Sequence, residues 1–437
     1  MKNDPVSLID QTPMGKAQIG VVLLCILLNA LDGFDVLSIA FASPGIAEEF
    51  TINRAVLGVV LAMELIGMCV GSVILGNLAD NLGRRPVILG CLVVMALGMY
   101  FAGGAQSVNE LSFHRFYTGL GIGGMLATTN AMVAEFSNLK HRSLCVMLMA
   151  GGYPLGVVIG GSVASGLLVH DTWRAIFEFG AIATVAFLPV VWFFLPESVA
   201  YHTIKRGKDS LLKINACLKQ MGKEGVDSLP DVTDKAKTSI FELFKPARLR
   251  ITIVLTIAYF MHIMTLYFLL KWTPKIVVDM GYSASSAGGV LVWANVGMLT
   301  GSILFGLLSS RIATRKLMSF ALVMSSVMIY IFGKGYSELA QLSMVAGITG
   351  FFINGGVVGL YALLAEYYPD NLRASGTGFS IGVGRGGAAL SPIAAGVLFT
   401  AGYGLSVVAL FMAFGSVFAA IALIFLKARS HQEKVTL

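Results

Sequence analysis

The sequence predicts an all-α membrane protein with twelve transmembrane helices in two pseudo-symmetric six-helix bundles. Hydrophobic residues make up 56% and charged residues 13% of the 437 residues, whereas soluble domains carry about 25% charged residues. Fifty glycines accompany this composition, as expected where small residues let helices approach closely in lipid. The apolar residues fall in long runs, and about 20 residues suffice to cross a bilayer as a helix.

Twelve apolar runs follow one another along the chain. Their centres lie near Leu28, Met68, Met95, Gly121, Leu155, Val185, Phe260, Gly297, Met324, Phe352, Arg385 and Phe414. A polar stretch between the sixth and seventh runs can hold short amphipathic helices. It divides the chain into a first bundle (1–196), a cytoplasmic loop (197–250) and a second bundle (251–437). We expect no cleavable signal, because the first sixteen residues are polar and the first run is too long.

Lysine and arginine residues gather on one side of the membrane when the twelve spans are drawn. The loops assigned to the opposite side hold few of them, namely Arg54, Arg174, Lys271, Lys275 and Lys334. Because positive residues stay cytoplasmic, both termini and the central loop are expected in the cytoplasm. The net charge of +7 is therefore a topology signal, and nucleic acid is not an expected partner because the charges are spread between membrane spans.

The two halves repeat with an offset of 230 to 231 residues. Pro44 corresponds to Pro274, and Gly58 to Gly288. Parallel six-helix repeats are a transporter architecture, with the substrate near the membrane midplane. The halves diverge in the first helix of each, where Asp32 aligns with His262.

Asp32 and Asp35 lie inside the first apolar run, three residues apart and so on one helix face. A charge near the bilayer centre costs at least about 2.5 kcal/mol. Carboxylates in a wet membrane cavity commonly carry protons or pair with charged substrates. The alternative is a pair of structural polar anchors. Glu64, in the second run, either joins the proton path or lies solvated near the outer mouth.

Three motifs identify a family resemblance. Gly76–Arg85 (GNLADNLGRR) resembles the signature between the second and third helices of the major facilitator superfamily, although Asn81 stands where the family has a basic residue. His114–Gly124 resembles its fourth-helix arginine and glycine motif, and Leu195–Ser198 resembles the end of its sixth helix. In the second copy of the first signature, Ser310 replaces the aspartate.

Two further motifs resemble those of the aromatic acid:proton symporters. These are Asp32–Asp35 (DGFD) and Gly382–Gly387 (GVGRGG). Gly151–Gly156 only partly resembles the motif of drug:proton antiporters, so export is less favoured. The resemblance implies proton-coupled uptake of a benzoate or hydroxybenzoate across the bacterial inner membrane by alternating access. We also expect a monomer without a cofactor.

Nine residues are candidates to bind such a substrate: Arg385, Arg115, His262, Tyr259, Tyr267, Trp293, Asn295, Asn354 and Tyr361. The guanidinium of Arg385 can hold a carboxylate in a bidentate fork, and Arg115 can pair with Asp32 or Asp35. The alternative for both arginines is a permanent structural ion pair. The aromatic residues and His262 supply flat walls and polar handles, or are ordinary helix packing.

Charged residues at the cytoplasmic helix ends are expected to form networks that latch that side in one of two states. They are Asp80, Arg84, Arg85, Glu135, Arg142, Glu366 and Arg373. A solvated loop face is the alternative for this set.

Three other functions are alternatives to this transport. An enzyme is disfavoured because the sequence shows no metal spacing, nucleophile elbow or phosphate loop. A transport-inactive receptor on the same fold is possible in principle, but it would have no need of the two aspartates. A carrier of an aliphatic mono- or dicarboxylate such as muconate is the alternative substrate class.

Overall fold

The computed structural model describes residues 4–426 except 208, 230–239, 310 and 369. The described residues form fifteen α-helices and one 3-10 turn, with no strand among them. The long helices are α2 (Lys16–Glu49), α3 (Arg54–Leu82), α4 (Arg84–Gly104), α5 (Val108–Phe136), α6 (Arg142–Leu167), α7 (Arg174–Phe194), α10 (Pro246–Asp279), α11 (Ala284–Leu308), α12 (Thr314–Phe332), α13 (Leu339–Tyr367), α14 (Asp370–Thr400) and α15 (Leu405–Ile424). The short elements are α1 (Pro5–Gln11), α8 (Val199–Lys205), α9 (Ser210–Gln220) and η1 (Ile240–Phe244).

The long helices repeat in order and in length. Helices α2 and α10 both have 34 residues, and α5 and α13 both have 29. Helices α2 and α10 also carry an internal proline at the matching place, Pro44 in α2 and Pro274 in α10. The internal repeat read from the sequence is therefore present in the helices themselves.

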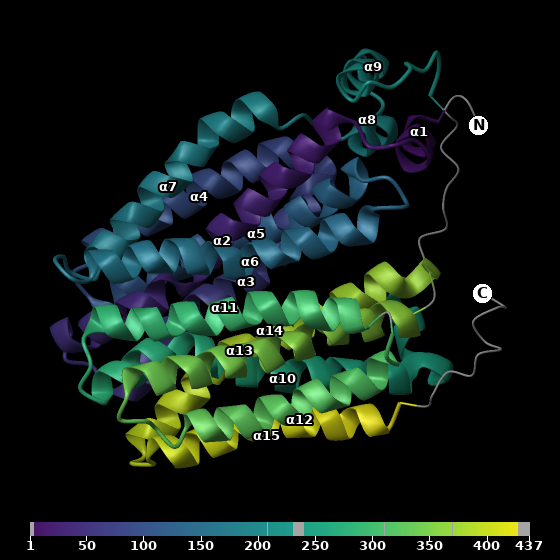
Figure 1. The fold of residues 1–437 in the computed structure, drawn as a ribbon. Coiled ribbons are helices and arrows are strands. Elements are labelled where there is room, and N and C mark those ends of the chain that lie inside the picture. The colour runs from purple at the N-terminus through teal and green to yellow at the C-terminus, as the bar shows by residue number, and fades with distance from the viewer. Residues whose placement is uncertain (1–3, 208, 230–239, 310, 369, 427–437) are drawn as a thin grey trace. The chain divides into compact units, whose positions relative to one another are not determined.

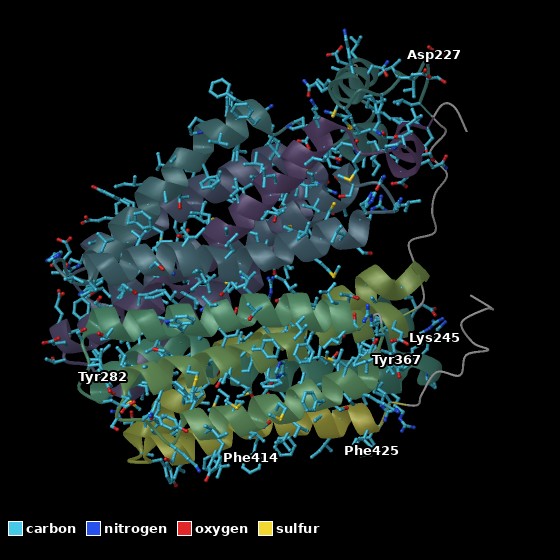
Figure 2. All side chains as sticks on the ribbon, in the orientation of Figure 1. Asp227, Lys245, Tyr282, Tyr367, Phe414 and Phe425 are labelled. Carbon is cyan, nitrogen blue, oxygen red and sulfur yellow. The ribbon has the colours of Figure 1, made fainter. Side chains whose placement is uncertain are left out.

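Eleven of the described helices are long and apolar enough to cross a membrane. The remaining long helix, α5, occupies the fourth predicted span but buries several polar side chains, which lower its hydropathy: Arg115, Thr118, Thr128 and Thr129. Other helices turn apolar side chains outward. Figure 2 shows Phe414 and Phe425 pointing away from the neighbouring helices, and they are 43% and 57% exposed. Such surfaces suit lipid contact.

Contacts divide the chain into two compact units. The first comprises Met1–Ser38, Ile66–Gly160 and Asp171–Lys235. Within it, α4 packs against α5 and α7. The second comprises Ile39–Leu65, Gly161–His170 and Ala236–Leu437. Within it, α10 packs against α11, α14 and α15, and α13 packs against α11 and α12 (Figure 1).

Glycines set the distance between helices in both units. A Cβ on Gly156 of α6 would lie 1.7 Å from the Ala30 carbonyl oxygen of α2. A Cβ on Gly297 of α11 would lie 1.8 Å from the Gly347 carbonyl oxygen of α13. These backbones touch, so any side chain at either glycine would force the helices apart.

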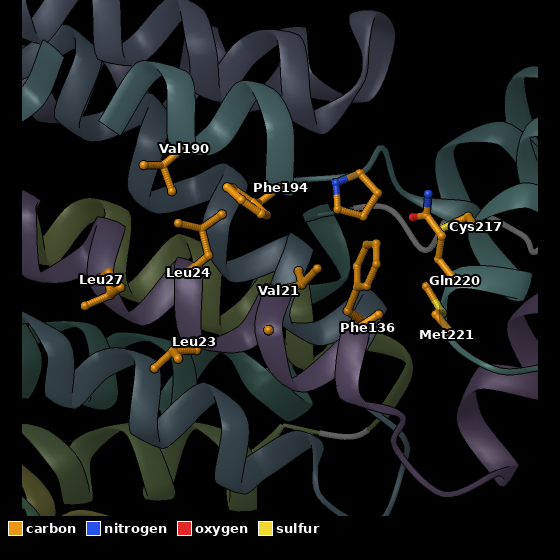
Figure 3. A pocket seen from close by; sticks show the side chains of 13 residues that line it. Val21, Leu23, Leu24, Leu27, Phe136, Val190, Phe194, Cys217, Gln220 and Met221 are labelled. Carbon is orange, nitrogen blue, oxygen red and sulfur yellow. The ribbon is translucent and has the colours of Figure 1, made fainter. Parts of the chain in front are cut away.

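An apolar groove of about 400 Å³ lies beside the short helix α9, which buries its own apolar face (Figure 3). Leu24 of α2, Phe194 of α7 and Cys217 of α9 are among its walls. Gln220 is the most polar side chain of the lining, and no charged side chain contributes. The groove therefore lacks the polar groups that an anionic substrate needs.

Candidate functional site

The two aspartates of α2 lie buried in the first unit. Asp32 is 2% exposed and Asp35 is fully buried. The backbone carbonyl of Asp35 accepts a hydrogen bond from Arg115 Nη2 of α5 at 2.8 Å. Thr184 Oγ1 of α7 lies 3.4 Å from Asp35 Oδ2. Three helices therefore bring an acid, a guanidinium and a hydroxyl together where lipid-like surroundings make each charge costly.

Arg115 has further contacts besides the Asp35 carbonyl. Its side chain is fully buried, and its guanidinium carbon lies 5.2 Å from the ring centre of Phe177. Nη1 also contacts the sulfur of Met99 at 2.9 Å. The structure brings Arg115 to the backbone carbonyl of Asp35, and its predicted pairing with a carboxylate of Asp32 or Asp35 stays a prediction. Thr184 was not among the residues named from the sequence. Its only sequence signal is one hydroxyl in an apolar run.

A second cluster lies in the second unit around Arg385. Arg385 is a half-buried residue of α14. Beside it, a Cβ on Gly384 would lie 2.0 Å from the ring of Tyr259, so that ring packs directly on the α14 backbone. The Tyr259 hydroxyl lies 3.1 Å from the Tyr361 hydroxyl, and the ring centres are 5.7 Å apart. Both Arg385 and Tyr267 lie within electrostatic range of the Tyr259 hydroxyl.

His262 bridges three helices of the second unit. Its Nε2 lies 2.9 Å from the Ile353 carbonyl oxygen, and its Nδ1 lies 2.7 Å from the Ser416 hydroxyl. Because a carbonyl only accepts hydrogen bonds, Nε2 carries the proton, and Nδ1 of the neutral ring accepts from Ser416. Both ring nitrogens are thus engaged within the protein. This geometry favours the alternative of a satisfied core histidine.

The two asparagines named from the sequence also have partners within the protein, whereas the tryptophan is exposed. Asn354 donates to the Met298 carbonyl oxygen at 2.9 Å and also contacts the Ser302 hydroxyl. Asn295 donates to the Leu291 carbonyl oxygen one turn back. Trp293 is 56% exposed. The two amides join or stiffen helices here, and the tyrosines around Arg385 remain the stronger candidates for ligand contact.

Glu64 has a partner that the sequence did not reveal. Its Oε2 lies 3.3 Å from Nζ of Lys271, and both side chains are fully buried. Lys271 was assigned to a loop on the outer side, and the structure corrects this. It lies within α10, eight residues before the helix ends at Asp279. An isolated lysine can lie in an apolar helix when another helix supplies a carboxylate.

Part of the predicted charge network assembles around Arg84. Nη1 of Arg84 lies 2.5 Å from Asp80 Oδ1, and Nη2 lies 3.0 Å from Glu135 Oε1. Arg85 instead donates to the Trp192 carbonyl oxygen, and Arg142 pairs with Asp10 of α1. Glu366 lies in the last turn of α13, and the Arg373 side chain lies outside the described residues.

Glu197 caps helix α4. It belongs to the Leu195–Ser198 motif, and the sequence analysis gave it no role of its own. Its carboxylate accepts backbone N–H bonds from Arg84 at 2.8 Å and Arg85 at 3.2 Å. A carboxylate is favourable at a helix N-terminus. The approach requires Gly83, whose φ is +108° and whose Cβ would lie 2.3 Å from Glu197 Oε2. Burial raises the pKa of Glu197, and its backbone hydrogen bonds to Ser198, Arg84 and Arg85 offset part of that rise.

Comparisons with known proteins agree with these observations. The sequence profile of the family described as Major Facilitator Superfamily matches residues 23–298 and 255–436. The chain is 27% identical to a gallate transporter of Pseudomonas putida over 401 residues, covering 91% of this chain and 89% of that protein. It is 29% identical to the 4-hydroxybenzoate transporter PcaK of the same organism, covering 89% and 87%. The xylose transporter XylE from E. coli, in a partially occluded inward open conformation, has a similar fold, with a TM-score of 0.72 at 17% identity and coverage of 92% and 96%.

Proposed function

This chain belongs to the Major Facilitator Superfamily and is a multi-pass membrane transporter, not an enzyme, and we propose that it carries a small aromatic carboxylate. The relatives described above are named for gallate and 4-hydroxybenzoate and align with about nine tenths of the chain. The observation that carries the proposal is the packing of the Tyr259 ring on Gly384, the residue before Arg385, together with the contact of Tyr259 with Tyr361. A cation and aromatic surface thus lie near each other inside the membrane helices.

The chemistry of this cluster suits such a ligand. The fork of Arg385 matches a carboxylate with two parallel hydrogen bonds. Tyr259 and Tyr361 offer ring faces to the aromatic group and hydroxyls to its substituents. An aliphatic dicarboxylate such as muconate would use the arginine but gain little from the rings. The aromatic substrate is therefore preferred over the aliphatic one.

Proton coupling is assigned to the acid cluster of the first unit. Asp32 and Asp35 are buried, and Arg115 and Thr184 contact Asp35. A cation that approaches or leaves a buried carboxylate changes its proton affinity. Proton binding at one of the aspartates then precedes or accompanies substrate binding, which gives symport. Glu64 is not needed for this step, because Lys271 engages it.

Alternating access follows from rocking of residues 1–196 against 251–437, in a protein that works as a monomer. The sidedness of the lysines and arginines supports a cytoplasmic location of both termini and of the Arg84 network in a bacterium, with the loop after α2 outside. The Asp80–Arg84–Glu135 contacts then act as the cytoplasmic latch.

Counterflow in proteoliposomes tests the substrate. Vesicles loaded with unlabelled 4-hydroxybenzoate should accumulate labelled 4-hydroxybenzoate from outside, and gallate or benzoate should compete better than muconate. A receptor that binds without transport would give no exchange of label. Exchange of muconate but not of any aromatic acid would replace the proposal by the aliphatic alternative.

A further inference from the structure

The buried pair of Glu64 and Lys271 is a third group of polar side chains, beside the two clusters described above. Its charged atoms are 3.3 Å apart, and neither side chain is exposed. Glu64 belongs to α3, in the first sequence half, and Lys271 belongs to α10, in the second. A lysine and a glutamate this far inside a membrane protein are costly unless they are paired.

A second ion pair joins the same two helices, α3 and α10, at their ends. Arg54, the first residue of α3, lies 2.8 Å from Asp279, the last residue of α10. Its side chains are 42% and 27% exposed. At 1.5 Å per residue, Glu64 lies about 15 Å further along α3 and Lys271 about 12 Å further along α10. One exposed and one buried pair therefore hold the same two helices at two levels.

Between these two ion pairs, the backbone of α3 packs directly against the backbone of α14. A Cβ on Gly58 of α3 would lie 2.4 Å from the Pro392 carbonyl oxygen of α14. A Cβ on Gly396 of α14 would lie 2.4 Å from the Arg54 carbonyl oxygen. This close packing leaves no room for a solute between α3 and α14. A path at this end of the protein requires the two helices to separate.

We infer that Glu64 and Lys271 form a buried charge latch that holds the first part of α3 against the second-half helices, and that this latch breaks whenever a path opens there. The inference rests on the alternating access of the proposed function. In the closed arrangement the two ions pair with each other. In the open arrangement water hydrates each of them. Removal of one partner takes this pairing from the other ion only in the closed arrangement, which is thereby selectively destabilised.

A cysteine reporter in the packed face measures this opening. Ala62 is fully buried and lies one helical turn from Gly58, on the face that meets α14. In Ala62→Cys protein, a membrane-impermeant maleimide should react slowly. Adding Glu64→Gln should raise the labelling rate at least about tenfold, because the buried Lys271 loses its pairing with Glu64. Protein without the reporter cysteine gives the background from the native cysteines.

Two further variants separate charge pairing from damage to the fold. Exchange of the charges, Glu64→Lys with Lys271→Glu, should return the labelling rate towards that of the reporter protein. Arg54→Gln is the matched control at the exposed pair and should change the rate less than about twofold, because exposed pairs contribute little. If Glu64→Gln does not fold, the exchanged pair alone carries the test, since a latch predicts a folded protein with slow labelling.

Three results would overturn the inference: unchanged labelling in Glu64→Gln, an equal rise in Arg54→Gln, or fast labelling in the exchanged pair. Labelling needs no substrate. A protein that labels as predicted but does not exchange aromatic acids would therefore refute the proposed substrate and leave the latch standing.

Discussion

Asp80 and Glu135 share one arginine but should contribute unequally to the cytoplasmic latch. Both carboxylates lie within 3.0 Å of Arg84, yet Asp80 is 66% exposed and Glu135 only 19%. An exposed ion pair is worth at most about 1 kcal/mol, so Asp80→Asn should change the rate of switching by no more than about fivefold. A largely buried hydrogen bond to a charged group is worth about 1.5–3 kcal/mol, so Glu135→Gln should change it by about 10- to 150-fold.

Turnover of 4-hydroxybenzoate counterflow in proteoliposomes, at equal amounts of folded protein, measures both variants. Neither substitution should change which aromatic acids compete, because the latch is a separate cluster from Arg385. An Asp80→Asn effect larger than that of Glu135→Gln would contradict the ranking by burial. A changed competition pattern would show that the Arg84 network takes part in substrate recognition and is not a latch.

Two other predictions concern single residues. Arg385→Ala should weaken binding of 4-hydroxybenzoate by at least tenfold, since one buried charge-assisted contact costs about 2–5 kcal/mol. Arg385→Lys should lose only part of the affinity, because the charge remains and the fork does not. Calorimetry on folded protein checks both, and wild-type affinity in Arg385→Ala would assign the residue a structural role. Burial raises the pKa of Glu197 above its ordinary value of 4.5, and the backbone hydrogen bonds from Ser198, Arg84 and Arg85 offset part of this rise. At pH values between 4.5 and the raised pKa, the folded protein binds more protons than the unfolded chain, so its stability falls as pH rises. Glu197→Gln should flatten that part of the melting-temperature profile, and an unaltered slope would assign the slope to other groups.

The sequence predicted the fold well because the membrane simplifies the problem. Backbone groups in lipid must be satisfied within each segment, so long apolar runs have to become helices. The repeat then predicted which helices correspond, and Pro44 and Pro274 occupy matching places in α2 and α10. Helix α5 shows the limit of apolarity as a signal, since its buried Arg115 and threonines suit a functional interior rather than lipid.

Side-chain pairing was far harder to predict, because it depends on contacts between distant segments. Lys271 pairs with Glu64 across 207 positions, and Arg142 pairs with Asp10 across 132. Charge bias alone therefore assigned Lys271 to a loop. The roles of single polar residues were equally hidden. Only the Ile353 carbonyl and the Ser416 hydroxyl show that both nitrogens of His262 are occupied.

Proton coupling through the buried aspartates is the central claim, and Asp35 is its most direct test. The measurement is uptake of labelled 4-hydroxybenzoate into proteoliposomes with and without an inward proton gradient, for wild type and Asp35→Asn. Wild type should accumulate substrate against its gradient only when the proton gradient is present. Asp35→Asn should lose this accumulation and retain counterflow, because the amide keeps the shape of the side chain and cannot ionise. Uphill accumulation by both Asp35→Asn and Asp32→Asn would contradict the account.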